Sequence, residues 1–256
     1  MSPQAHFKTM GGTGPDCVLI HGFASDRMSW AANTVALMGV ASVHAVDLPA
    51  HGEASADIGD GSIDALANSI AVALEENQIS KTHIIGHSLG GAIALKLAAK
   101  HPDIIASLTL IAPVGLGSGL DYYFLRGITN NSDHDATLVL LRQLVVKPHL
   151  INKLVVKRLL DQLAKPEIRK SWSKIIDQLQ SVAEFDIPGT LKSLPHSLPK
   201  LVIWGDGDHI NPLCFARLEE FGLKPTIIAE TGHIPHIEKA DPFNRLATSF
   251  LSSLDH

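Results

Sequence analysis

The sequence lacks features that are typical of disulfide-rich, nucleic-acid-binding and membrane-spanning proteins. Cysteine occurs only twice, as Cys17 and Cys214, far apart and without metal-ligand spacing, so we expect two buried free thiols in a reducing compartment. Basic residues number 21 against 26 acidic ones, and the net charge of −5 does not suggest a nucleic-acid partner. No apolar run approaches the roughly 20 residues of a membrane span, and the N-terminus has no apolar core of signal-peptide length. We therefore expect a cytoplasmic protein with neither a nucleic acid nor a membrane as its partner.

Short apolar runs alternate with helix-like patterns along much of the chain. Strand, helix, strand, helix on short connections predicts an α/β fold, with a mostly parallel sheet that helices cover on both faces. Ser62 is the expected N-cap of one helix, and Ser25 or Asp26 that of another. The predicted strands are residues 5–10, 17–23, 41–49, 82–87, 104–113, 200–208 and 224–232, and the predicted helices between and after them are 25–39, 63–77, 89–100 and 242–254.

The alternation stops after Pro113. Between residues 114 and 195 the sequence shows no strand, and three amphipathic helices are predicted over 137–146, 151–165 and 167–185. An insertion of this size into a compact domain is usually functional. We therefore expect an α/β core of residues 1–113 and 196–256 and a helical cap insertion of residues 114–195.

One serine stands at a junction between a strand and a helix. Ser88 lies between Gly86 and Gly90 in the stretch IIGHSLGGAIAL, which contains the pattern Gly-x-Ser-x-Gly. In a strand–turn–helix context this pattern is a nucleophile elbow, in which the glycines leave room for a tight turn and the serine hydroxyl is raised above the sheet. The helix that follows points its amide end at the site, which favours developing negative charge. Ser88 is therefore the predicted nucleophile.

A serine hydroxyl needs a base to remove its proton and an acid to orient that base. With a nucleophile elbow the acid and then the histidine follow the serine along the chain. The loop WGDGDHINP offers Asp206 and Asp208, and TGHIPHIE offers His233 and His236. Spacing alone leaves both choices open.

Acyl-transfer chemistry also needs two N–H groups that stabilise an oxyanion. One is expected from the residue after the nucleophile, which is Leu89. The other is expected from the loop after an early strand, where His-Gly-Phe places the Phe23 N–H.

Five segments together carry a resemblance to a family. The segments HGF, DLPAHGEAS, GHSLGG, WGDGDHINP and TGHIPHIEKADPF follow the order found in the α/β-hydrolase superfamily, which the chain resembles over nearly its whole length. This resemblance implies that Asp208 is the acid and His233 the base. It implies that His236 either supports these residues from outside the triad or lines the pocket. The segment PAHGEAS departs from the usual Pro-Gly-His-Gly through Ala50, and we interpret His51 as a packed turn residue.

Three of the segments are similar to a narrower group. IHGFASDRMSW, VHAVDLPAHGEAS and SLTLIAPVGLGSG look like the hydrolase-like C-terminal domain of the dihydrolipoamide acetyltransferase component of acetoin dehydrogenase. That resemblance implies acetyl transfer from a lipoyl arm to coenzyme A as an alternative activity. A lipoyl-bearing domain is not expected here, since only about fifteen residues precede the first main strand.

The sequence thus predicts a serine-dependent acyl-transfer enzyme, acting on an ester or thioester of a small molecule. Ser88, His233 and Asp208 are the predicted triad, and activity should rise through about pH 6–7 because the base must be neutral. No metal or cofactor is expected, and coenzyme A would be a co-substrate only for an acyltransferase. Some apolar residues of the insertion should line an acyl pocket, with Leu138, Leu141, Leu144 and Val145 as examples.

Three rival interpretations are weaker. GLGSGL resembles part of a dinucleotide-binding fingerprint, but Leu120 occupies the third glycine position and no strand precedes the acidic Asp135. A hydrolase fold kept as a binding module would have no physical need for an intact triad. A hydrolase with an aspartate nucleophile is disfavoured because position 88 is serine.

Overall fold

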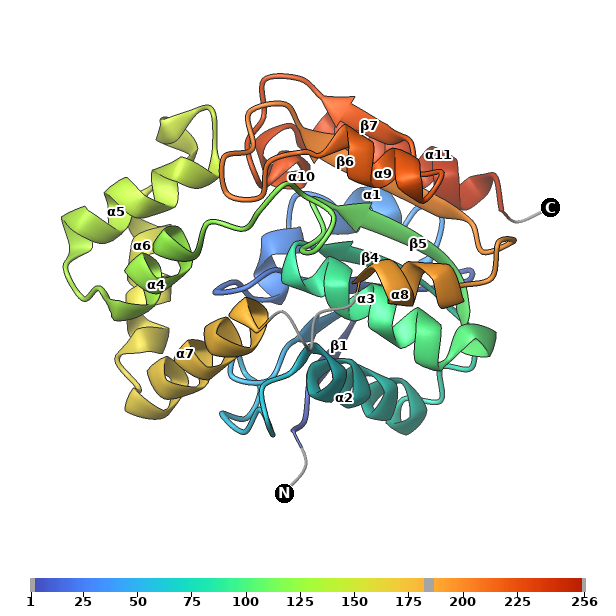
Figure 1. Cartoon of the computed structure of the whole chain (residues 1–256). Coiled ribbons are helices and arrows are strands. Elements are labelled where there is room, and N and C mark those ends of the chain that lie inside the picture. Colours follow the sequence, from blue (N-terminus) through green and yellow to red (C-terminus); the bar gives the residue numbers. More distant parts are fainter. Residues whose placement is uncertain (1–2, 182–186, 255–256) are drawn as a thin grey trace.

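A seven-stranded sheet lies at the centre of the molecule (Figure 1). The computed structural model describes residues 3–181 and 187–254. The first strand runs antiparallel to its neighbour, and the other neighbouring strands are parallel, which confirms the mostly parallel sheet predicted from the sequence. In spatial order the strands are β1 (His6–Gly11), β3 (Ser42–Asp47), β2 (Asp16–Ile20), β4 (Thr82–His87), β5 (Ile105–Ile111), β6 (Lys200–Gly205) and β7 (Pro225–Ile228).

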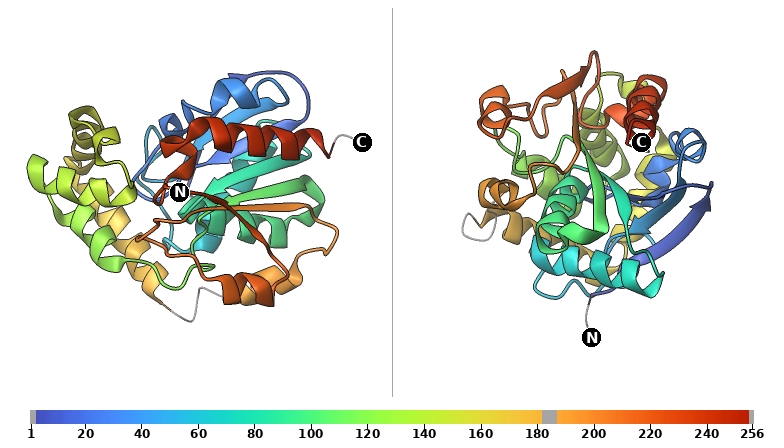
Figure 2. Two further views of the ribbon diagram at one scale, coloured as in Figure 1. Left: turned by 90° about the horizontal axis from the view of Figure 1, so that it is seen from above. Right: turned by 90° about the vertical axis from the view of Figure 1, so that its right-hand side faces the viewer.

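Helices cover both faces of this sheet (Figure 2). On β2, Val18 and Ile20 pack in the core cluster on one face of the sheet, whereas Cys17 and Leu19 pack in the cluster on the other face. All four side chains are fully buried, as expected for a strand that is covered on both faces. The first face carries α2 (Ile63–Glu76), α3 (Leu89–Lys100), α8 (Ile187–Ser193) and α9 (Phe215–Glu220), and the second carries α1 (Thr34–Leu37) and α11 (Ala240–Ser252).

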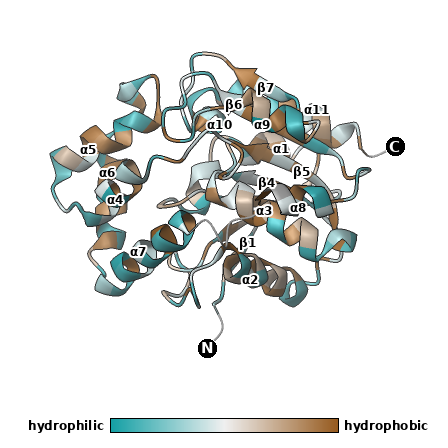
Figure 3. Ribbon diagram, in the orientation of Figure 1, coloured by the Kyte–Doolittle hydropathy of each residue, from teal (hydrophilic) through white to brown (hydrophobic). Residues whose placement is uncertain are grey.

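A group of helices lies between β5 and β6 in the sequence and beyond one end of the sheet in space (Figure 1). Hydrophilic and hydrophobic residues lie side by side on these helices, as α7 illustrates (Figure 3), so one face packs inward while the other meets solvent. None of the described helices is long and apolar enough to cross a membrane. The group consists of α4 (Tyr122–Asn130), α5 (His134–Leu141), α6 (Lys153–Leu163) and α7 (Pro166–Gln180), with the 3₁₀ turns η3 (Arg142–Leu144) and η4 (Pro148–Leu150).

The sequence did not predict α4. The helix is only nine residues long and follows the glycine-rich GLGSGL, which reads as a hinge. Its start is nevertheless well defined, because the Asp121 side chain accepts a hydrogen bond from the Phe124 N–H. Phe124, Leu125 and Ile128 are its buried apolar residues, so its apolar face extends over little more than one turn.

The single helix predicted over 25–39 is wrong. The structure has a 3₁₀ turn, η1 (Arg27–Trp30), and then the short α1, with Asp26 rather than Ser25 capping the first of them. Tertiary contacts favour the break between them. Asn33, at the N-cap of α1, donates from its side chain to the His236 carbonyl and the Asn244 side chain, although more than 200 residues separate it from either.

Smaller differences concern one cysteine and two helix ends. Both cysteines are free thiols, but Cys214 is half-buried rather than buried, because it lies at the N-cap of α9 instead of inside a strand as Cys17 does. Helix α11 begins at Ala240, ahead of Pro242, since a helix tolerates proline in its first turn. Helix α7 ends at Gln180, before the end predicted at residue 185, and residues 182–186 lie outside the described part of the chain.

Candidate active site

The turn at Ser88 joins the end of β4 to the start of α3. Ser88 has a φ of +52°, a strained value for a residue with a side chain. A methyl group added at Gly86 would lie 2.5 Å from the Gly90 carbonyl oxygen, and one added at Gly90 would lie 2.3 Å from the Ile20 carbonyl oxygen. The two glycines therefore allow the strand, the turn and the helix to approach this closely. The Ser88 side chain makes no capping hydrogen bond, which leaves its hydroxyl available to another partner.

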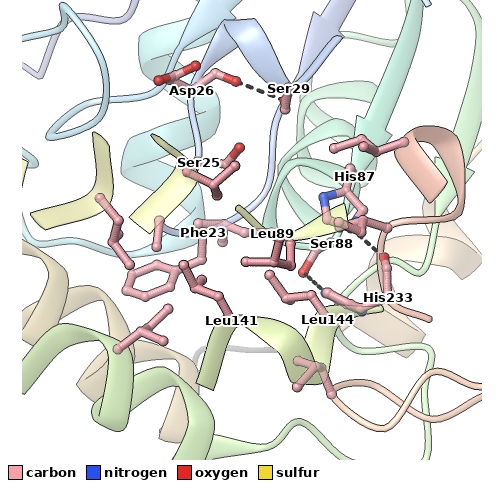
Figure 4. A pocket seen from close by; sticks show the side chains of 18 of the residues that line it. Phe23, Ser25, Asp26, Ser29, His87, Ser88, Leu89, Leu141, Leu144 and His233 are labelled. Atoms are coloured by element: carbon pink, nitrogen blue, oxygen red, sulfur yellow. Dashed lines mark hydrogen bonds between the residues drawn. The ribbon is translucent and has the colours of Figure 1, made fainter. Parts of the chain in front are cut away.

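That partner is His233 (Figure 4). The Nε2 atom of His233 lies 2.9 Å from the Ser88 hydroxyl, and its Nδ1 atom lies 2.8 Å from a carboxylate oxygen of Asp208. With the Nδ1 proton donated to the carboxylate, Nε2 carries the lone pair that accepts the hydroxyl proton. The structure thus brings Ser88 together with two residues that lie more than a hundred positions further along the chain.

Asp208 is held by four hydrogen-bond donors. One carboxylate oxygen accepts from the Ile210 and Asn211 N–H groups, and the other accepts from the Trp204 indole as well as from His233. Such saturation fixes the rotamer of the carboxylate and therefore the plane of the imidazole ring. Asp206, the alternative acid in the sequence, is exposed, and within the described part of the chain it accepts only a long hydrogen bond of 3.3 Å from the Thr231 N–H.

The backbone of His233 is fixed at both its polar atoms. Its N–H donates to the Leu144 carbonyl, and its carbonyl accepts from the Nε2 atom of His87, each at 2.8 Å. Burial lowers the pKa of His87 well below its usual value, so this ring is neutral and holds its proton on Nε2 for that bond. His87 was not predicted as a site residue, although its position directly before Ser88 in the turn was a usable signal.

Two N–H groups near the serine hydroxyl are free. Phe23 and Leu89 both line the cavity described below, and among the described residues neither N–H has a hydrogen-bond acceptor. The next N–H, that of Ala24, donates to the Nε2 atom of His51. The ring of His51 is buried and stacks on Trp172 at 5.1 Å between centroids, so His51 is packed against the loop that carries Phe23 and Ala24.

A cavity of about 350 Å³ opens beside Ser88 and His233 (Figure 4). Ser88 and His233 lie at its base, and an ion pair of 3.0 Å between Asp26 and Arg158 lies in its wall. Most of the remaining wall is apolar. Leu141 and Leu144 line it, whereas Leu138 and Val145 pack in the core cluster. The inserted helices contribute Phe124, Leu125, Ile128, Leu141, Leu144 and Leu159 to the lining.

His236, the alternative base in the sequence, also borders this cavity but does not reach Ser88. Its ring is fully buried between the rings of Trp30 and His87, with centroids 4.7 Å from each. Neither of its nitrogen atoms has a hydrogen-bond partner among the described residues. Within the described residues no group of three or more His, Cys, Asp or Glu side chains is arranged to hold a metal ion.

Burial of histidines makes the fold sensitive to acid. Burial lowers the pKa of His51 and of His236 to about 3, with a smaller contribution from neighbouring histidines. In the unfolded chain both imidazoles bind protons below their usual pKa of about 6.5. The unfolded state therefore binds more protons than the folded state between about pH 6.5 and about pH 3, and the free energy of unfolding falls as the pH falls through this window. At pH 5 each ring lowers the free energy of unfolding by about 2 kcal/mol relative to its value at pH 8.

Urea unfolding at several pH values between 8 and 5 measures this cost. His236→Leu has a similar side-chain volume and should reduce the slope of unfolding free energy against pH by about 1.4 kcal/mol per pH unit below pH 6. His149→Leu is the matched control, because His149 is exposed. Equal slopes in wild type and His236→Leu would show that the buried ring does not resist protonation.

Comparisons with known proteins give matches over nearly the whole chain. The sequence profile described as "alpha/beta hydrolase fold" matches residues 18–240. The chain is 32% identical to the dihydrolipoyllysine-residue acetyltransferase component of the acetoin cleaving system of Pseudomonas putida over 247 residues, which are 96% of this chain and 65% of the relative. It is 26% identical to the pimeloyl-(acyl-carrier protein) methyl ester esterase of Vibrio vulnificus over 264 residues, with 98% and 99% of the two chains covered.

Solved structures with the same fold are also found. The 2-hydroxy-6-oxo-6-phenylhexa-2,4-dienoate hydrolase of a Rhodococcus strain superposes with a TM-score of 0.84 at 22% identity, and the alignment covers 98% of both chains. A meta-cleavage product hydrolase superposes with a TM-score of 0.83 at 23% identity, covering 98% of this chain and 95% of the other. At identities of 23% and 22% these two similarities show the fold alone. The chain spans slightly less than two thirds of the acetyltransferase component, at 65% of its length.

Proposed function

Because the chain is an enzyme of the α/β-hydrolase fold family, we propose that it is a serine-dependent acyl-transfer enzyme that hydrolyses a carboxylic ester or thioester. The observation that carries this proposal is the hydrogen-bonded series Ser88, His233, Asp208 at the base of an apolar cavity. In the tautomer with its proton on Nδ1, His233 donates to Asp208 and accepts from Ser88, which is the arrangement that removal of the serine proton requires.

The proposed reaction has two steps. The Ser88 oxygen attacks the acyl carbon while His233 Nε2 takes its proton, and the negative charge moves to the carbonyl oxygen, where the N–H groups of Phe23 and Leu89 stabilise it. The imidazolium then protonates the leaving alcohol or thiol, which departs and leaves an acyl-Ser88 ester. A water molecule attacks that ester by the same route and releases the acid. Asp208 stabilises the imidazolium in both steps and stays ionised.

The proposed substrate has an apolar acyl group of small to medium size. The cavity volume of about 350 Å³ is near the lower end of the range for small-molecule sites, roughly 300–1,000 Å³. We propose that α4 to α7, within the insertion predicted over residues 114–195, form a cap, since their leucine, isoleucine and phenylalanine side chains make much of the apolar wall, whereas α8 packs on the sheet. A cytoplasmic location and the absence of a cofactor remain predictions from the sequence.

A second candidate function is transfer of the acyl group to a thiol, such as that of coenzyme A. The observation that favours it is the 32% identity to the acetyltransferase component of an acetoin cleaving system. The triad chemistry is the same for both functions, and only the nucleophile that resolves the acyl-Ser88 ester differs.

The test is a single-turnover assay with p-nitrophenyl acetate, butyrate and octanoate, combined with intact-protein mass spectrometry. We expect a burst of p-nitrophenol and a mass increase on Ser88 that matches the acyl group. Faster loss of the adduct with coenzyme A than with water alone would favour the transferase. If neither a burst nor an adduct formed with any of the three esters, the chain would be a binding module with this fold or an enzyme for another bond.

A further inference from the structure

Residues 144–147 connect the cavity to the loops that carry the triad. This segment joins η3 to η4, and the Leu144 side chain lines the cavity close to Ser88 and His233 (Figure 4). The same segment belongs to the inserted helices and not to the sheet that carries Ser88. Its contacts therefore decide how the insertion and the catalytic centre are joined.

The segment packs directly against the backbone of both triad loops. A methyl group added at Gly232, the residue before His233, would lie 2.4 Å from the Leu144 carbonyl oxygen. One added at Gly207, the residue before Asp208, would lie 2.6 Å from a methyl group of Val146. At Gly232 the neighbour is a backbone atom, so only glycine permits this approach, and the Leu144 carbonyl accepts the His233 N–H at 2.8 Å.

The Glu238 side chain holds residues 144–147 and the loop of His233 together through hydrogen bonds. Its carboxylate is buried, and it accepts hydrogen bonds from the N–H groups of Lys147 at 2.7 Å, Gly232 at 2.8 Å and Val146 at 3.2 Å. One side chain thus holds two N–H groups of the inserted segment and the N–H immediately before His233. Bonds from N–H groups to a buried carboxylate are stronger than those between neutral groups, so the two segments have little freedom to separate.

A buried carboxylate is costly unless its oxygen atoms are satisfied, and an apolar side chain would fill the same volume without that cost. Neither the triad hydrogen bonds nor the cavity lining includes Glu238. Its contacts instead constrain one feature that the chemistry needs, which is the position of the His233 backbone relative to Ser88.

We propose that Glu238 is a positioning residue that fixes His233 for proton transfer by bonding its loop to residues 144–147. The inference rests on the proposed function, in which His233 is the base. Without Glu238 the His233 loop keeps its bonds to Leu144 and His87 but loses the bond at Gly232, and the imidazole samples positions away from the Ser88 hydroxyl. A displacement of about 1 Å in such a site can lower the rate by up to roughly 100-fold.

The kinetic test compares Glu238→Gln with Glu230→Gln, which makes the same chemical change at an exposed residue paired with Lys239. A glutamine at 238 keeps one acceptor oxygen and replaces the other by a donor, so at least one of the three N–H groups loses its partner. Assayed at a temperature where circular dichroism shows both variants folded, Glu238→Gln should lower the acylation rate by about 10- to 100-fold on both p-nitrophenyl acetate and octanoate. KM should stay within about twofold, and Glu230→Gln should match wild type.

Two kinetic results would overturn the proposal. A rise in KM on octanoate alone, with kcat unchanged, would mean that Glu238 only shapes the acyl cavity. Unchanged kcat with a lowered melting temperature would mean that it only stabilises the fold.

A measurement without substrate separates this proposal from the function on which it rests. The His233 Nδ1 proton, bonded to Asp208, should give a far-downfield proton NMR signal that is lost or broadened in Glu238→Gln and kept in Glu230→Gln. An unchanged signal in Glu238→Gln would refute positioning of His233. If wild type shows the signal and Glu238→Gln loses it while no acyl-Ser88 forms with any ester, positioning holds and the proposed function fails.

Discussion

Ser88→Ala should lower kcat on p-nitrophenyl butyrate by about 10⁶-fold. The alanine removes the only atom that can form the acyl-enzyme, and the remaining rate comes from water attacking a substrate that the oxyanion groups still polarise. Because Ser88 makes no capping bond, its loss should leave the fold intact. The burst and the acyl adduct should both disappear.

Ser252→Ala is the matched control for this variant, since Ser252 is exposed at the end of α11. It should keep the activity of wild type. A Ser88→Ala protein that retained more than about a hundredth of the activity would exclude Ser88 as the nucleophile, because no positioned donor or base alone accounts for so much residual rate.

Asp208→Asn should lower kcat by about 10⁴-fold with little change in KM. The Ile210 and Asn211 N–H groups select the carbonyl oxygen of the new amide, so its NH₂ group turns toward Trp204 and His233. Facing a donor, the imidazole adopts the tautomer with its proton on Nε2, and it can no longer accept a proton from Ser88. Steady-state kinetics at pH 8 measure the loss.

Asp206→Asn makes the same change at the exposed neighbouring acid and should have at most a twofold effect, because its single bond to the Thr231 N–H survives in the amide. If the two variants lost activity equally, the acid of the triad could not be assigned to Asp208. A larger loss in Asp206→Asn would assign it to Asp206 instead.

Much of the fold follows from short-range patterns in the sequence. The predicted bounds of β4 and α3 agree with the structure, since a continuous apolar run, a glycine-flanked turn and a helical pattern follow one another without interruption. The α/β fold, its mostly parallel sheet and the resemblance to the α/β-hydrolase family are confirmed. The break between η1 and α1 could not be predicted, because it depends on bonds from Asn33 to residues more than 200 positions away.

The candidate site shows the same limit. Spacing offered two acids and two histidines, and only the family resemblance chose among them, because the choice depends on which loop reaches Ser88 in space. The contacts of His87 and Glu238 involve backbone atoms of residues 146, 147, 232 and 233, and a contact with a backbone atom does not depend on the side chain at that position, so the amino-acid sequence does not indicate it.

The bonds at residues 144–147 also bear on how the substrate range of this chain could be altered. The Leu144 carbonyl and the N–H groups of Val146 and Lys147 are main-chain groups, so almost any side chain can replace these residues without breaking the bonds to His233 and Glu238. Proline at 146 or 147 is the exception, because it has no N–H group to donate. Redesign of the acyl pocket can therefore vary the side chains that meet the substrate while the backbone bonds to the catalytic loop are kept.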